Sequence, residues 1–74
     1  MFAERSSPLF PAYGRTRAIE QWREAAQLVW TRWDAFQEAA PEARQWTFAA
    51  YVAALDAESA AAATVANLAI ADAA

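Results

Sequence analysis

Two stretches of the chain place apolar residues at alternating spacings of three and four. The first extends over residues 16–40, and its apolar positions are Ile19, Trp22, Ala26, Val29, Trp33, Phe36 and Ala40. This rhythm is typical of a helix that packs along one stripe against another helix. Polar residues, among them Glu20, Gln27 and Asp34, fall on the opposite face. The pattern predicts an amphipathic helix with Thr16 as its N-cap residue.

The second stretch, residues 41–71, has an apolar row on each of two opposite faces. The bulkier row consists of Phe48, Val52, Leu55, Ser59, Ala62, Ala66 and Ala69. The other row is mostly small and consists of Trp46, Ala50, Ala53, Ala57, Ala60, Thr64 and Leu68. An α-helix turns by about 100° per residue, so the two rows lie about 180° apart. One neighbouring helix can cover only one of them.

Pro41 separates the two stretches. Proline disfavours helix at the residue before it, so the first helix should end by Ala40. The same proline suits the first position of a second helix. A connection this short normally joins antiparallel neighbours, which predicts an all-α, antiparallel two-helix hairpin. The alternative is one continuous helix with a sharp kink.

Residues 1–15 lack helical periodicity. Pro8, Pro11 and the single glycine, Gly14, interrupt the pattern, while Phe10 and Tyr13 are among the residues that make the segment apolar. Disordered segments are usually poor in aromatic residues. We therefore expect an irregular apolar arm that folds over the open end of the hairpin or docks on a neighbouring subunit.

The small row of the second helix is the predicted protein interface. We expect the bulky row, with Tyr51 at its rim, to pack against the first helix, which leaves the small row uncovered. Small side chains let two helix backbones approach closely, and Trp46 could meet Leu68 of a second copy in an antiparallel pair. This predicts a homodimer in the form of a four-helix bundle. Two alternatives remain open: a different protein covers the row, or the alanines face solvent as good helix formers.

Composition favours association over chemistry. A chain of 74 residues buries only about 60% of its unfolded surface, so it needs a disulfide, a metal or a partner for stability. It has no cysteine and no histidine, which leaves oligomerisation or a larger partner. The net charge of −3 makes nucleic acid and anionic membranes poor partners. No apolar run reaches the length of about 20 residues that a membrane span needs, so we expect a cytoplasmic protein.

No motif for catalysis, cofactor binding or metal binding is present. The serines and threonines have no histidine or lysine to activate them, and a single glycine cannot form a phosphate-binding loop. Arg15, Arg17, Arg23 and Arg32 alternate with acidic residues, which predicts an ion-paired, solvated face. We therefore expect a non-enzymatic structural or protein-interaction subunit without a small-molecule substrate. The alternative is a regulatory binder, antitoxin-like or an adaptor, that occludes a protein partner.

Overall fold

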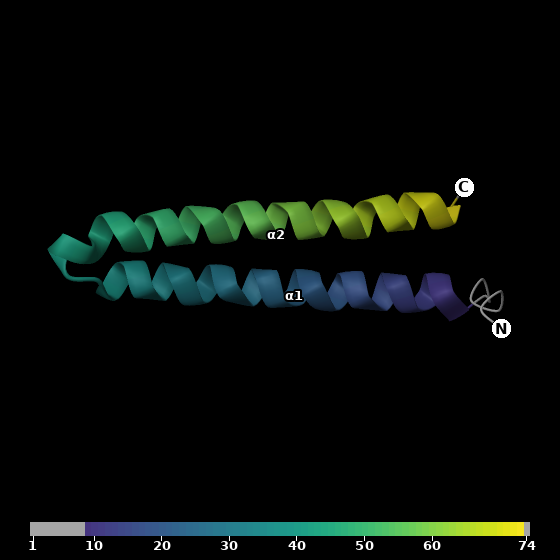
Figure 1. The fold of residues 1–74 in the computed structure, drawn as a ribbon, viewed down its shortest axis with the longest axis horizontal. Helices are drawn as coiled ribbons and strands as arrows, with labels where there is room; N and C mark the ends of the chain where they lie inside the picture. Colours follow the sequence, from purple (N-terminus) through teal and green to yellow (C-terminus); the bar gives the residue numbers. More distant parts are fainter. Residues whose placement is uncertain (1–8, 74) are drawn as a thin grey trace.

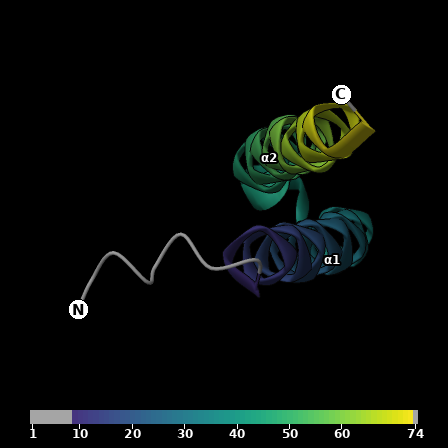
Figure 2. The same ribbon diagram turned by 90° about the vertical axis from the view of Figure 1, so that its right-hand side faces the viewer.

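The computed structural model describes residues 9–73 and consists of two long helices joined by a tight turn (Figure 1). Helix α1 spans Leu9–Glu38, the short 3-10 helix η2 spans Pro41–Ala43, and helix α2 spans Arg44–Ala73. The two long helices are antiparallel, and the end-on view of Figure 2 shows them as adjacent rods. The part of the chain that the structure describes contains no strand, so the predicted all-α hairpin is confirmed.

Helix α1 begins earlier than the sequence predicts. We expected an irregular arm over residues 1–15, but residues 9–15 belong to α1. Pro11 is compatible with this start, because a proline in the first turn lacks only an amide that has no partner inside the helix. Thr16 consequently lies inside α1 and is not its N-cap. The rest of the predicted arm, residues 1–8, lies outside the described residues.

Pro41 marks the turn between the two helices, as predicted, but it begins η2, and α2 itself begins three residues later, at Arg44. Helix α1 stops at Glu38, and Ala40 is extended with φ −65° and ψ 156°, which a following proline favours. Pro41 occupies the beginning of η2, where its missing amide is not needed. The amide of Ala43 donates a hydrogen bond of 2.9 Å to the carbonyl of Ala40 and closes the turn. The chain reverses here, so the kinked continuous helix is excluded.

The inward side of α1 is the predicted one. Its half-buried members are Ile19, Ala26, Val29, Trp33 and Phe36. Trp22 lies at the edge of the row and is more exposed, and Ala40 falls beyond the helix end. Ala18, one turn before Trp22, is also buried. The single apolar stripe of α1 was therefore sufficient to predict its orientation.

Helix α2 turns a different side inward from the predicted one. The inward residues of α2 are Thr47, Ala50, Tyr51, Ala54, Glu58, Ala61, Ala62, Val65 and Leu68. The expected packing of the bulky row against α1 is met only at its edge, where Phe48 contacts Phe36 and Ala62 is half-buried. The helix is rotated by about one residue, or 100°, so Ala54 faces α1 while Val52 and Leu55 are each 37% exposed. The physical reason is size. Helix α1 places large side chains such as Trp33 and Phe36 between the helices, so small residues on the facing side of α2 let the two helices approach closely.

Four aromatic rings lie close together near the turn. The ring centroids of Trp33 and Tyr51 are 5.0 Å apart, and those of Phe36 and Phe48 are 5.4 Å apart. Trp33 and Phe36 are in contact along α1 at 5.6 Å. All three pairs are tilted, an arrangement worth about 0.5–1.5 kcal/mol per pair beyond burial. Tyr51, which was expected at the rim of the packed surface, lies instead in the contact between the helices.

Candidate protein-interaction surfaces

The packed helices leave two long sides of the hairpin open. Val29 and Ala54 lie in the seam between the helices. Viewed from one end, two antiparallel helices turn in opposite senses. The residue that follows Val29 in α1 and the residue that follows Ala54 in α2 therefore point to the same side of the hairpin. Trp30 and Leu55 therefore share one side, and the residues that precede Val29 and Ala54 share the other.

The first of these surfaces, which we call the alanine side, carries most of the predicted interface. It is formed by Trp46, Ala53, Ala57, Ala60 and Thr64 of α2 with Leu28 and Arg32 of α1. All seven are exposed. The remaining two predicted interface residues, Ala50 and Leu68, are half-buried on the inward side of α2. The structure thus keeps five of the seven predicted residues together on one open surface, and whether a partner covers them stays a prediction.

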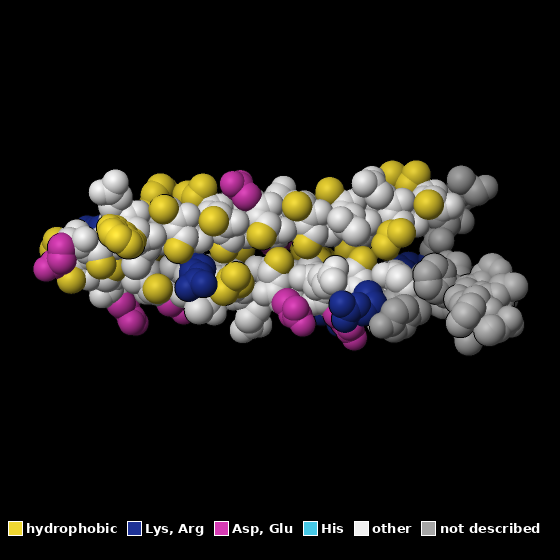
Figure 3. Space-filling view, viewed as in Figure 1, with side chains coloured by type: hydrophobic (Ala, Val, Ile, Leu, Met, Phe, Trp, Pro, Cys, Tyr) yellow, Lys and Arg dark blue, Asp and Glu magenta, His cyan; other side chains and the backbone are white. Residues whose placement is uncertain are grey.

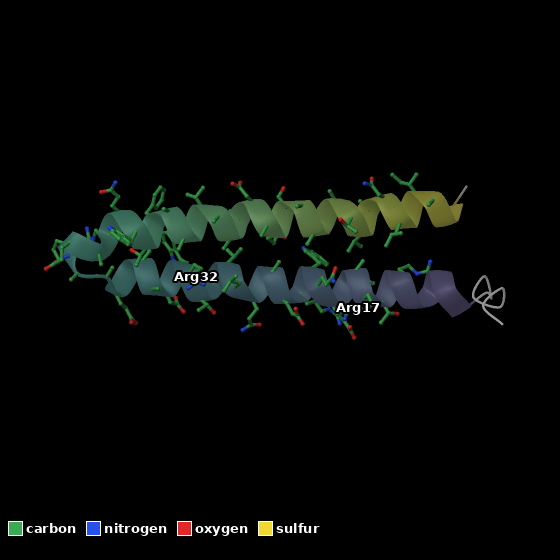
Figure 4. The ribbon with its side chains drawn as sticks, viewed as in Figure 1. Arg17 and Arg32 are labelled. Carbon is green, nitrogen blue, oxygen red and sulfur yellow. The ribbon has the colours of Figure 1, made fainter. Side chains whose placement is uncertain are left out.

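The alanine side is shallow and has one bulky anchor. Trp46 is 77% exposed and lines an open hollow of about 400 Å³ with Gln45 and Ala49. Figure 3 views this side and shows apolar atoms along α2 beside charged groups of α1. Two of the charged groups are Arg17 and Arg32, labelled in the same view in Figure 4. An apolar contact on α2 would therefore be bordered by guanidinium groups on α1.

The second surface, which we call the aromatic side, was not predicted as an interface. It is formed by Trp30 of α1 with Phe48, Val52 and Leu55 of α2. Trp30 is 67% exposed and Phe48 is 48% exposed, although Phe48 also contacts the aromatic rings near the turn. The spacing of the three α2 residues was visible in the sequence, but the row was expected to face α1. The one-residue rotation of α2 places it at the surface.

A hydrogen bond between the helices supports this rotation. The indole Nε1 of Trp22 donates to Oε2 of Glu58 at 2.7 Å, across 36 residues of sequence. Glu58 is half-buried on the inward side of α2. Beside it, Trp22 lines a hollow of about 140 Å³ with Ala62, Val65 and Ala66. Rotating α2 to bring Leu55 inward would carry the Glu58 carboxylate away from this donor, so the bond favours the observed packing.

We expect Trp22→Phe to lower the free energy of unfolding by about 1 kcal/mol, because it deletes the donor to Glu58 while keeping an aromatic ring. Trp46→Phe is the matched control, since the Trp46 indole makes no hydrogen bond with a described residue. Urea unfolding followed by circular dichroism measures both. Equal effects of the two substitutions would show that the bond to Glu58 does not contribute.

Three of the four arginines expected on an ion-paired face of α1 are unpaired within the described residues. Arg17, Arg23 and Arg32 make no ion pair with a carboxylate of the described residues. An ion pair on a helix is most favourable when the acid precedes the base by four residues, and the residues at that position are Tyr13, Ile19 and Leu28. These guanidinium groups remain available to a partner.

Other kinds of site can be assessed within the described residues. Residues 9–73 contain no cluster of three side chains suited to hold a metal ion. Neither α1 nor α2 has an apolar stretch of the length and hydropathy required to cross a bilayer.

Comparison with known proteins adds no functional assignment. The chain matches no protein-family model, no curated protein and no solved structure. The case for a function therefore rests on the two sides of the hairpin.

Proposed function

We propose that this chain is a non-enzymatic structural or protein-interaction subunit that self-associates, with two hairpins forming a four-helix bundle. One observation carries the proposal. Among the described side chains, the only buried hydrophobic residues are Ala18 and Ala54, which are 5% and 4% exposed. None of the large apolar side chains that the structure describes is fully buried. A hairpin is a single layer of helices, and a second layer is what normally creates a hydrophobic core.

The exposed aromatic residues supply a driving force for that second layer. Trp30, Trp46 and Phe48 are each about half exposed or more. An aromatic side chain presents about 150–250 Å², and burial contributes about 25 cal/mol per Å². In a symmetric dimer each covered side chain counts twice. Covering Trp30 and Phe48 in both hairpins therefore contributes on the order of 10 kcal/mol. This is comparable with the cost of association, about 4–15 kcal/mol.

The hollows of the hairpin support a binding role over a catalytic one. The hollow beside Trp46 is lined by an amide, an indole and a methyl group. The hollow beside Trp22 is lined by apolar groups. Neither lining contains a pair of carboxylates or a nucleophile next to a base, which are the arrangements that acid–base and covalent catalysis use.

The mass of the chain in solution tests this proposal. The monomer is 8.1 kDa, and we expect sedimentation equilibrium or light scattering to give twice that value at micromolar concentrations. Dilution should shift the mass toward the monomer by mass action. A monomeric mass at every concentration would contradict self-association. It would favour the alternative of a regulatory binder, antitoxin-like or an adaptor, whose apolar sides are covered by another protein.

A further inference from the structure

Exposed apolar bulk is unequally divided between the two sides of the hairpin. The aromatic side holds four large apolar residues, Trp30, Phe48, Val52 and Leu55. The alanine side holds two, Leu28 and Trp46, which are on different helices. Binding energy in protein interfaces is concentrated in a few clustered aromatic and aliphatic anchors, so the aromatic side is the better docking surface.

Two charged residues without partners flank Trp30 on the same side of α1. Arg23 precedes Trp30 by seven residues and Asp34 follows it by four, spacings that place all three on one helix face. Both charged side chains are exposed, and neither makes a hydrogen bond or ion pair with another described residue. At a rise of about 1.5 Å per residue they lie about 16 Å apart, so they cannot pair with each other.

A second copy related by a two-fold axis can supply an ion-pair partner for both Arg23 and Asp34. The midpoint between Arg23 and Asp34 falls near Val29. A two-fold axis at this point, perpendicular to the helices and in the plane of the interface, would place Arg23 opposite the partner's Asp34 and Asp34 opposite the partner's Arg23. The contact between Trp33 and Tyr51 gives the register of the hairpin, in which this midpoint is level with Leu55. The same axis therefore passes through the aromatic side on both helices.

The sizes of the α2 side chains also match across this axis. Leu55 would meet the partner's Leu55 at the centre. Phe48, toward the turn, would lie over the small side chains of the partner's Ala62 and the partner's Ala66. Val52 would lie opposite the partner's Ser59. Large residues at one end of the surface thus face small residues at the other, and close packing in an isologous interface needs this match.

We propose that a second copy of this chain docks antiparallel on the aromatic side, with Leu55 near the two-fold axis and Arg23 paired with the partner's Asp34. This proposal rests on the self-association proposed above and names its surface and register. A side of two helices about 45 Å long and about 20 Å wide covers about 900 Å², and a stable dimer needs about 800 Å² per partner. The alanine side would then lie on the outside of the dimer.

Charge reversal tests the pairing. Arg23→Asp places two carboxylates together at each end of the interface, and Asp34→Arg places two guanidinium groups together. We expect each single variant to raise the dimer dissociation constant about tenfold or more, measured by sedimentation. Mixing the two variants should restore dimer formation, because the mixed dimer regains both opposite-charge pairs. The double variant should dimerise like the original chain.

Arg32→Asp and Glu38→Arg are the matched controls. They repeat the same kinds of charge change on α1 outside the aromatic side, and both positions are exposed. We expect the dissociation constant of each control to stay within about threefold of the original value, since isolated surface charges couple weakly. Circular dichroism of every variant reports its helix content, so a loss of mass can be separated from a loss of folding.

The outcomes separate the two proposals. If the original chain is monomeric, self-association fails and this interface fails with it. If the original chain is dimeric and both aromatic-side variants stay dimeric, or if Arg32→Asp alone dissociates the dimer, self-association stands and the aromatic-side interface is overturned. Rescue by mixing Arg23→Asp with Asp34→Arg would support the pairing even if either variant alone folds less well.

Discussion

Replacing Trp33 by alanine is expected to lower the free energy of unfolding by about 2–3 kcal/mol. Trp33 is half-buried in the seam, and its ring contacts both Tyr51 across the hairpin and Phe36 along α1. The substitution removes the largest side chain of the aromatic contacts near the turn and leaves a gap between the helices. Urea unfolding followed by circular dichroism, at one fixed protein concentration, measures the loss.

Trp46→Ala is the matched control for this prediction. It deletes the same side chain from a site that is 77% exposed and has no contact with another aromatic ring in the described chain. We expect a change within about 0.5 kcal/mol, as for most surface substitutions. An equal loss in both variants would show that another molecule covers the Trp46 indole, and would favour the alanine side as the interface.

Ala54→Leu is expected to lower the free energy of unfolding by about 1–3 kcal/mol, because three additional carbon atoms do not fit between the helices. Ala54 is 4% exposed and lies between the two helices. Leucine is nearly as good a helix former as alanine, so helix propensity cannot account for the loss. Thermal unfolding followed by circular dichroism measures the change.

Ala63→Leu serves as the control for overpacking. Ala63 is exposed, and its distance of nine residues from Ala54 places it on the opposite face of α2. The same substitution there should change stability by less than about 0.5 kcal/mol. If Ala54→Leu is as stable as Ala63→Leu, the two helices do not pack through Ala54, and the observed rotation of α2 is wrong.

The orientation of α1 and the position of the turn could be predicted because each depends on local chemistry. Helix α1 has one apolar stripe, so only one side can favourably face another helix. Beyond the first turn of a helix, a proline removes a needed amide donor and restricts the preceding residue, so Pro41 predicts the end of α1. The start of α1 differs from the prediction, because Pro11 lies in the first turn of the helix, where a proline is tolerated.

The candidate interaction surfaces could be predicted only in part. The exposed alanine side was found, because a two-faced helix must leave one face uncovered by its own neighbour. The aromatic side was missed, because its α2 residues were assigned to the seam. Two facts were needed to recognise it: Leu55 is exposed, and Trp30 lies on the same side of the hairpin. The second fact depends on how the two helices are packed.

By itself, the sequence determined two helices, their antiparallel connection at Pro41 and the inward stripe of α1. Only the tertiary structure decided which side of α2 faces that stripe. Helix α2 is apolar on several sides, so burial alone gives nearly the same free energy for more than one rotation. The choice came from contacts between residues far apart in sequence: small residues such as Ala54 opposite the bulk of α1, and Glu58 within reach of the Trp22 indole.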